Sequence, residues 1–184
     1  ALVDKVWEPT AEVLTCFYDE IARLIKLVNG LNDIAKLEQT TSVLNKSKFN
    51  VSLELEKIIA SFKPIYRTSG LKIHSKLTPN LEILMDRDKF KQVIYNLLSN
   101  ALKYSKNGGK VLVTLSSLKD TIIIEVKDNG IGISEKDLPF IFERFYRSDE
   151  SRNKDTGGTG IGLTIVKNIV EAHKGTIKVT SSLG

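Results

Sequence analysis

Two asparagines one helical turn apart are the first residues of this chain whose spacing suggests chemistry. Asn96, Asn100 and Lys103 lie in a segment with helical apolar periodicity, and at about 100° per residue they fall on one side of its apolar face. Asparagine costs about 0.5 kcal/mol or more against alanine inside a helix, so we expect something outside the helix to need these amides. An amide oxygen can ligate Mg²⁺, and a lysine can meet a phosphate. The alternative is a pair of solvated asparagines at a helix edge.

A carboxylate ends the apolar segment 121–128, TIIIEVKD. Alternate isoleucine and valine positions of this segment share one face of a strand, and Asp128 continues that parity, so its carboxylate is expected to point inward. A buried carboxylate needs strong donors to offset several kcal/mol of desolvation, and an amino-purine edge could provide them. Gly130 and Gly132 would let the backbone pass close to a flat ring. The alternative is an aspartate in an Asx turn at a strand end.

A glycine-rich stretch at 157–163, GGTGIGL, opens a segment with helical periodicity. Backbone amides at such a helix N-terminus are available to bind phosphate, although a lone glycine motif is not specific. A polar run of ten residues, 147–156, precedes it. Because this run is too long and too polar for a tight turn, it predicts a mobile lid over the site.

The helices and strands that carry these residues are predicted from the periodicity of the apolar residues. We expect helices at about 52–66 and 88–105 and one ending near His173, strands at 71–77, 110–115, 121–128 and 176–180, and a short apolar run at 83–85. The two central strands are joined by about five residues, a hairpin length, so part of the sheet is antiparallel. This order predicts an α+β fold: a two-layer α/β sandwich with helices on one face of a mixed sheet, rather than a doubly wound nucleotide fold.

A heptad seam lies upstream of this α/β region. Its apolar residues alternate by three and four steps: Leu14, Phe17, Ile21, Leu24, Val28, Leu31 and Ala35, widened by Leu27 and Ile34. We expect a helix from 10 to 38 that joins a bundle, with residues 1–8 as the end of a preceding helix, and dimerisation into a four-helix bundle. The alternative is an ordinary amphipathic helix packed on its own domain.

The polar segment 39–50 predicts a linker, with a domain boundary near Lys46. The chain then divides into a partial helical domain at 1–46 and a second domain at 47–184. The first domain carries 5 Lys/Arg against 7 Asp/Glu, a net charge of −2. Because the whole chain has a net charge of +5, the second domain carries +7. These charges are scattered, so they favour neither nucleic acid nor anionic lipid as a partner.

The composition is that of a globular protein, with 41% hydrophobic and 27% charged residues among 184. It excludes disorder, and no apolar run is long enough to span a membrane. The single cysteine, Cys16, excludes an intramolecular disulfide, and with two histidines there is little material for a structural metal site. A reducing compartment is the simplest setting. The chain opens on Ala1 without an initiator Met, so we expect it to be a piece of something longer.

Four motifs together identify a family resemblance. NLLSNALKYS, DNGIGI, IFERFYRSDESR and GGTGIGLTIVKNIVEAHKGTI resemble, in order and spacing, the asparagine box, first glycine box, phenylalanine box and second glycine box of sensor histidine kinases. The resemblance covers 47–184, and segment 10–38 resembles the second helix of the dimerisation and phosphoacceptor domain of those kinases. It implies a Bergerat-type ATP-binding fold, shared with gyrase-like topoisomerases, Hsp-type chaperones and mismatch-repair ATPases.

The resemblance implies a role for each matching residue, with ATP and Mg²⁺ as cofactors. Asp128 would contact the adenine amino group, and Tyr104 would lie by the base. Asn100 would ligate Mg²⁺, while Asn96 and Lys103 would help to place the metal and the phosphates.

The remaining site residues lie in the phenylalanine and glycine boxes. Arg147 would approach the γ-phosphate and act in catalysis together with Asn96 and Lys103. The residues that would surround the rest of the nucleotide are Gly130, Gly132, Gly158, Thr159, Gly160, Gly162 and Leu163.

Asn96 separates the kinase from its hydrolytic relatives, which carry a glutamate at this position as a general base for water. A neutral imidazole needs no such base, so we expect transfer of the γ-phosphoryl group to a histidine of the bundle, with catalysis by positioning and charge neutralisation. The resemblance implies a homodimer through the bundle, a response regulator receiver domain as partner, and no nucleic acid or direct membrane contact. It implies a cytoplasmic location, as part of a membrane-bound sensor.

Two departures from the family pattern stand out. The phosphoacceptor motif, a histidine followed by an acid and a proline, does not occur, so we expect the acceptor upstream of Ala1. His74 is expected to be solvated on a strand, and His173 to be a packed or capping residue at a helix end. The chain stops at SSLG, before the last strand that the family has, so we expect one sheet edge to lack its neighbour.

Two other functions compete with this prediction. The first is an ATP-driven clamp of the topoisomerase or chaperone type, which Asn96 and the heptad segment disfavour. The second is a degenerate kinase that serves as an interaction module, which the intact Asp128, Asn100 and glycine boxes disfavour.

Overall fold

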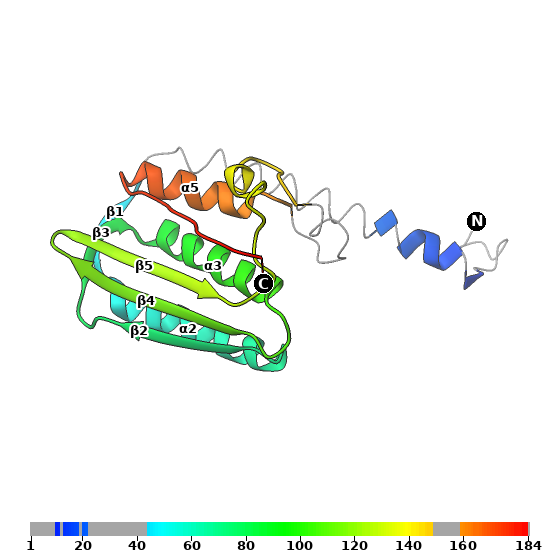
Figure 1. Cartoon of the computed structure of the whole chain (residues 1–184), viewed down its shortest axis with the longest axis horizontal. Helices are drawn as coiled ribbons and strands as arrows, with labels where there is room; N and C mark the ends of the chain where they lie inside the picture. Colours follow the sequence, from blue (N-terminus) through cyan, green and yellow to red (C-terminus); the bar gives the residue numbers. More distant parts are fainter. Residues whose placement is uncertain (1–9, 12, 19, 22–43, 149–158, 184) are drawn as a thin grey trace, which may run out of the picture.

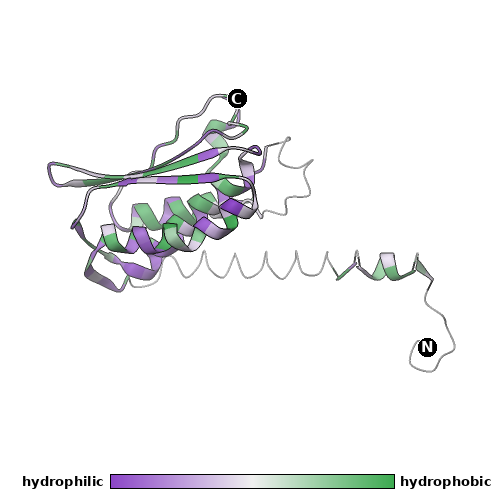
Figure 2. Ribbon diagram, turned by 90° about the horizontal axis from the view of Figure 1, so that it is seen from below, coloured by the Kyte–Doolittle hydropathy of each residue, from purple (hydrophilic) through white to green (hydrophobic). Residues whose placement is uncertain are grey.

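The computed structural model describes residues 10, 11, 13–18, 20, 21, 44–148 and 159–183. From residue 44 onward the elements are β1 (Lys46–Asn50), α2 (Val51–Thr68), β2 (Lys72–Leu77), β3 (Glu82–Asp86), α3 (Arg87–Tyr104), β4 (Lys110–Leu118), β5 (Thr121–Asp128), the short 3-10 turn η1 (Leu138–Phe140) and α5 (Gly162–Ala172). Figure 1 shows their arrangement, and Figure 2 shows the helices on one side of the strands. The predicted α+β fold with helices on one face of the sheet is confirmed.

The main sheet is mixed, as predicted. Its strand order is β2-β4-β5, with β2 parallel to β4 and β4 antiparallel to β5. The β4–β5 hairpin turns at Lys119, whose φ of 53° lies in the left-handed region. In this hairpin Val111 is opposite Asp128, and Leu115 is opposite Ile124. The register therefore sets Asp128 on the same face as the buried residues of β4.

A second, two-stranded sheet corrects the predicted linker. Residues 46–50, assigned to a linker that runs over 39–50, form β1, which pairs antiparallel with β3. Lys48 makes an ion pair with Glu82 at 2.6 Å, and the Phe49 ring packs against that of Phe90 at 5.6 Å. The linker prediction is wrong here because one apolar side chain and a ladder of backbone bonds suffice to order a strand whose other residues are polar.

Polar side chains cap the two helices that follow these strands. The Asn50 side chain accepts from the Leu53 amide at 2.9 Å at the start of α2. Asp86 caps α3 by accepting from the amides of Asp88 and Lys89, both at 3.1 Å. Because Asp86 occupies the cap, α3 begins at residue 87, one position before the predicted start.

An ion pair between a buried carboxylate and an exposed guanidinium joins α2 to α3. Glu54 is almost fully buried on α2 and accepts from Nη2 and Nε of Arg87, at 2.6 and 3.1 Å. Lys91 lies 3.8 Å from the other oxygen of this carboxylate. With two cations at one carboxylate, the first turns of both helices are fixed to each other.

The apolar core lies between the helices and the main sheet. Its fully or almost fully buried members come from α2, α3, β4 and α5 and include Leu55, Tyr66, Phe90, Ile94, Leu98, Val111, Val113, Leu115, Ile165 and Val166. Each such side chain contributes about 1.5–3 kcal/mol when it is fully buried. The same burial fixes the direction of α3, whose other side carries the asparagines.

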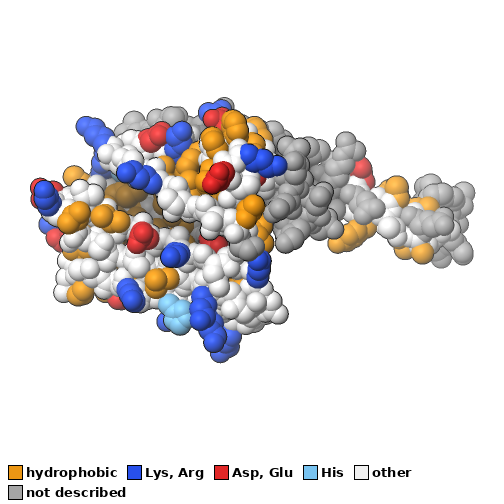
Figure 3. Space-filling model, in the orientation of Figure 1, with side chains coloured by type: hydrophobic (Ala, Val, Ile, Leu, Met, Phe, Trp, Pro, Cys, Tyr) orange, Lys and Arg blue, Asp and Glu red, His pale blue; other side chains and the backbone are white. Residues whose placement is uncertain are grey.

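The predicted last strand at 176–180 is wrong. These residues have no strand assignment, and the only ladder that β5 makes within the described chain is with β4. Ile177 packs against the core, and the Ser181 hydroxyl accepts from the Ile133 amide at 2.9 Å. A strand requires a hydrogen-bonded neighbour, and none of the described residues supplies one. Figure 3 shows a hollow with hydrophobic atoms between β5 and α5.

The N-terminal segment is described only in part. Residues 11, 13–18, 20 and 21 are helical, and Figure 1 places them away from the sandwich. Leu14, Phe17 and Ile21 of the predicted seam are 55%, 50% and 56% exposed. The rest of the seam, from 22 to 38, lies outside the described residues, so the bundle and the dimer stay predictions. Within the described ranges, no helix has the length and apolar character needed to cross a membrane.

Candidate functional site

Asn96 contacts the start of α5. Its side-chain nitrogen donates to the Gln92 carbonyl at 2.9 Å, one turn back in α3. Its amide oxygen lies toward Gly162, where a Cβ atom would come within 3.2 Å of it. Gly162 is the first residue of α5, so the absence of a side chain lets the amide approach the helix N-terminus. This contact brings together two of the predicted motifs, the asparagine stripe and the second glycine loop.

The N-terminus of α5 has no side-chain cap. Ile161 occupies the N-cap position and makes no side-chain hydrogen bond there. The first-turn amides lack a helical partner by position, and no side chain among the described residues is recorded as capping them. Gly160 has a φ of 73°, and a Cβ there would lie 2.8 Å from the Tyr146 carbonyl oxygen. A glycine-led turn at the positive end of a helix dipole is suited to an anion.

The flanking residues of this turn were also predicted to bind the nucleotide. Thr159 and Leu163 are half-buried on either side of it. Gly158 lies outside the described residues, as does most of the polar run that was predicted to form a lid.

The other end of α3 holds the first glycine loop. The Tyr104 carbonyl accepts from the Ile131 amide at 3.1 Å, and a Cβ on Gly130 would collide with that same carbonyl oxygen. At Gly132, with a φ of 75°, a Cβ would collide with the Ser182 carbonyl. The protein's own backbone therefore requires both glycines, which is a different reason from the flat ring predicted from the sequence.

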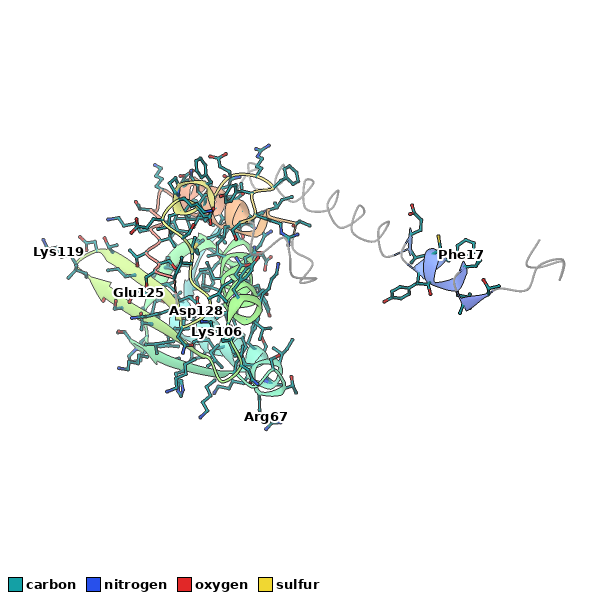
Figure 4. All side chains as sticks on the ribbon, turned by 45° about the vertical axis from the view of Figure 1, so that its right-hand side comes forward. Phe17, Arg67, Lys106, Lys119, Glu125 and Asp128 are labelled. Carbon is teal, nitrogen blue, oxygen red and sulfur yellow. The ribbon has the colours of Figure 1, made fainter. Side chains whose placement is uncertain are left out.

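Asp128 ends β5 directly before this loop. Its Oδ1 accepts from the Gly130 amide at 2.9 Å, which is the Asx turn named as the alternative. The prediction of a buried carboxylate is wrong, because Asp128 is exposed. The predicted parity holds, since Asp128 pairs with the fully buried Val111. The carboxylate is exposed because the strand ends there and the chain turns away from it. Figure 4 shows Asp128 close to Lys106, just beyond the end of α3.

Tyr66 lies beneath this part of the site and was not predicted. It is fully buried on α2, and its hydroxyl donates to the Leu98 carbonyl of α3 at 2.7 Å. Burial, and secondarily the charge of Asp128, raise the pKa of Tyr66 well above its ordinary value. The phenol therefore stays neutral and acts as a donor. Sequence periodicity gives no signal for it, since a tyrosine on an apolar helix face predicts only core.

The remaining predicted residues of α3 lie between these two ends. Asn100 and Lys103 are half-buried, and the Lys103 ammonium lies 4.8 Å from the centroid of the Tyr104 ring. From Asn96 to Tyr104 the helix rises about 12 Å. The structure thus aligns all four side-chain positions along one helix, with a glycine loop at each end, which suits an elongated ligand whose two ends differ chemically.

Arg147 is half-buried and follows Tyr146, whose hydroxyl donates to Asp137 at 2.7 Å. The Ser134 hydroxyl donates to the other oxygen of Asp137 at 2.6 Å. These two hydrogen bonds, that of Ser134 first, hold the pKa of Asp137 below its usual range. The apolar periodicity of the sequence does not predict this cluster. The spacing of Ser134 and Asp137, a hydroxyl residue and an acid three positions later, was the available signal.

Both histidines lie where the sequence predicted. His74 is exposed on β2. His173 ends α5: its Nε2 accepts from the Asp86 amide at 3.1 Å, and its Nδ1 donates to the Ile169 carbonyl at 2.8 Å. It is a packed residue that joins the end of α5 to the start of α3.

The side-chain oxygens of α3 could ligate a magnesium ion whose other ligands are water and phosphate oxygens. Among the described residues no group of three or more His, Cys, Asp and Glu could hold a metal ion. Mg²⁺ generally takes only one or two protein oxygens and completes its shell with water and phosphate oxygens. The amide oxygens of Asn96 and Asn100 satisfy this requirement, provided that a phosphate chain lies along α3.

Comparison with known proteins connects this geometry to a family. The chain is 33% identical over 177 residues to the signal transduction histidine-protein kinase BaeS of Escherichia coli K12, a match that covers 96% of this chain and 38% of BaeS. The chain therefore spans well under half the length of that relative. The predicted resemblance to sensor histidine kinases is confirmed.

Two solved structures share the fold. The histidine kinase AdeS of Acinetobacter baumannii superposes with a TM-score of 0.69 at 26% identity, covering 99% of this chain and 84% of that one. Full-length ShkA in complex with AMPPNP superposes with a TM-score of 0.74 at 24% identity, covering 97% of this chain and 38% of that one. Residues 85–184, more than half of the chain and all of the candidate site, match one family description. The chain belongs to the family of histidine kinase-, DNA gyrase B- and HSP90-like ATPases.

Proposed function

We propose that this chain binds Mg-ATP along α3, as the catalytic region of a sensor histidine kinase that transfers the γ-phosphoryl group to a histidine upstream of Ala1. One observation carries the proposal. The same helix meets the uncapped, glycine-led N-terminus of α5 at Asn96 and the Asp128 turn at its other end. These two ends suit the phosphates and the base of one nucleotide.

Asp128 and Tyr104 would bind the base. The Gly130 amide holds Oδ1 of Asp128, so the carboxylate has a fixed direction and its other oxygen can accept from an adenine amino group. A charged acceptor contributes about 1.5–3 kcal/mol in such a bond. Tyr104 lies next to this turn through its carbonyl contact with Ile131, and its ring would lie by the base.

The phosphate chain would lie between α3 and the start of α5. Backbone amides of the Gly158–Leu163 segment would bind its oxygens. Asn100 and Asn96 would hold the metal ion, which when bound neutralises charge on the phosphates. Lys103 would add a cation from α3, and Arg147 would meet the γ-phosphate from the phenylalanine box. Catalysis then consists of positioning and charge neutralisation.

Asn96 favours transfer to a histidine over hydrolysis. A neutral amide cannot take a proton from water, and the nitrogen of Asn96 is held by the Gln92 carbonyl. Hydrolysis by a clamp-type ATPase needs a general base, which this position does not provide. The same reasoning leaves an imidazole, which needs no base, as the acceptor.

The partners follow from this function. The acceptor histidine would lie in the helical bundle. Because Leu14, Phe17 and Ile21 are exposed, they would face a second copy of the chain in that bundle. A response regulator receiver domain would take the phosphoryl group from the histidine. A cytoplasmic location, as part of a membrane-bound sensor, remains part of this proposal.

Calorimetric titration with Mg-ATP tests the binding step, and radiolabelled ATP with a longer chain that includes the upstream histidine tests the transfer. We expect binding by the chain described above and acid-labile label on the longer one. Steady phosphate release without such label would favour a clamp-type ATPase. Neither binding nor label would leave an interaction module.

A further inference from the structure

The Asp137 carboxylate holds two hydroxyls at once. Tyr146 donates to one oxygen at 2.7 Å and Ser134 to the other at 2.6 Å, lengths typical of strong bonds from a hydroxyl to a carboxylate. The amides of Asp137 and Leu138 both donate to the Ser134 carbonyl, at 3.0 and 3.1 Å. The carboxylate is thus fixed by its own turn before it reaches Tyr146.

Tyr146 is also held by its ring. The ring packs against that of Phe140, with centroids 5.6 Å apart, and between them the amide of Glu143 donates to the Phe140 carbonyl at 2.8 Å. Asp137 therefore closes a loop whose two ends are joined by a charged hydrogen bond and whose middle is packed. The last residue of this closed loop directly precedes Arg147.

The main chain of Tyr146 contacts the second glycine loop. Gly160 can approach the Tyr146 carbonyl only because it lacks a Cβ, which would lie 2.8 Å from that oxygen. Two residues later Gly162 contacts Asn96. The backbone that carries Arg147 is therefore placed with respect to Asn96 through direct contacts. The hydrogen bond from the Tyr146 hydroxyl to Asp137 supports this backbone.

We infer that Asp137 is a positioning residue that acts through Tyr146 to direct Arg147 at the terminal phosphate. This inference rests on the proposed function, in which Arg147 meets the γ-phosphate. An arginine side chain has several rotatable bonds, so its reach depends on where its main chain is held. Without the bond to Asp137, the contact with the γ-phosphate weakens, whereas contacts with the base and the first two phosphates remain.

The affinity for ATP relative to ADP tests this inference. We expect Asp137→Asn and Tyr146→Phe each to raise the Kd for Mg-ATP by about three- to tenfold and to leave that for Mg-ADP unchanged, as measured by calorimetry. The matched controls are Asp120→Asn at the exposed β4–β5 turn and Tyr95→Phe, at a tyrosine of α3 that is 44% exposed. Neither control should alter either Kd. Thermal melts confirm that all variants are folded.

A double-mutant cycle separates positioning from a purely structural role. In a chain that already carries Arg147→Ala, Asp137→Asn should cause no further loss of ATP affinity, because its effect passes through the arginine. Equal losses for ATP and ADP, additive losses in the cycle, or no loss at all would overturn the inference while ATP binding by the parent stands. A parent chain that binds neither nucleotide would instead overturn the proposed function, and this inference with it.

Discussion

Asp128 keeps one carboxylate oxygen in its own turn and presents the carboxylate at the open end of β5. In the proposed function this group selects adenine by accepting from its amino group. We expect Asp128→Asn to lower ATP affinity by about 1.5–3 kcal/mol, since a charged acceptor is lost, and GTP to bind the parent poorly. Calorimetry measures both, with Asp120→Asn as the control. Equal affinities of the parent for ATP and GTP would remove Asp128 from this role.

Asn96 lies against the first residue of α5, where a bound phosphate chain would begin its contact with the helix amides. Asn96→Glu would add a general base while Asn100 still holds the metal ion. We expect slow ATP hydrolysis to rise by about 10², as is typical of a positioned base. The new charge also repels the phosphates, so the affinity is measured alongside the turnover. An unchanged rate at saturating ATP would place Asn96 away from the attacking water.

At the scale of elements, the start of α3 is a junction that orients the site. Asp86 accepts from the amides of Asp88, Lys89 and Asn45, while its own amide donates to His173 at the end of α5. A single residue thus joins the first turn of α3 to the residue before β1 and to the residue that ends α5. The angle between α3 and α5, which brings Asn96 to Gly162, depends on this junction.

Asp86→Ala should therefore destabilise the fold by about 1–2 kcal/mol through the lost cap. Burial raises the pKa of Asp86, but the hydrogen bonds from the Lys89, Asn45 and Asp88 amides outweigh it, so the pKa lies below its ordinary value of 3.8. The charged form is the stabilising one. The difference between parent and variant is then full above about pH 4 and shrinks as the pH falls through the lowered pKa.

Denaturant unfolding of parent and variant at pH 7 and at several acidic values measures this difference. Asp88→Ala is the matched control, because Asp88 is in the first turn of the same helix but its side chain is 90% exposed. It should change stability little. A loss in Asp86→Ala that stays constant down to pH 2 would contradict the role of the ionised cap.

At the scale of the whole molecule, the sequence predicts what alternation and motif spacing encode. The sequence correctly predicts β5, most of β4 and, to within one residue at each end, α3, because the apolar positions of these elements face one core. It does not predict β1, whose polar residues are ordered by pairing with a distant strand. Nor does it predict that residues 176–180 have no strand partner within the part of the chain that the structure describes. Both depend on which neighbour is available, and periodicity does not contain this information.

The candidate site follows the same division. Residues within one element, such as Asn96 and Asn100, are predicted from spacing, because a helix fixes their relation. The exposure of Asp128 and the bond from Tyr146 to Asp137 depend on how loops turn beyond their elements. No repeat or period in the sequence encodes such contacts, so they require the structure.

In the proposed function this chain binds Mg-ATP. The placement of its two histidines predicts that it does not phosphorylate itself. His74 is exposed on β2 beside Leu112, a residue that alternates with the fully buried Val111, so His74 lies on the face of the sheet away from the helices. Both ring nitrogens of His173 are engaged, by the Asp86 amide and the Ile169 carbonyl.

Incubation with ATP labelled at the γ-phosphate, followed by acid and base treatment, measures this outcome, with the longer chain as the positive control. We expect no acid-labile label on this chain, because a nucleophilic imidazole nitrogen must be free and must reach the phosphate end of the site. Acid-labile label would contradict the prediction. His74→Gln and His173→Gln would then show which ring accepted the phosphoryl group. If His74→Gln lost the label, the nucleotide would have to reach the outer face of the sheet, in the same or another copy of the chain.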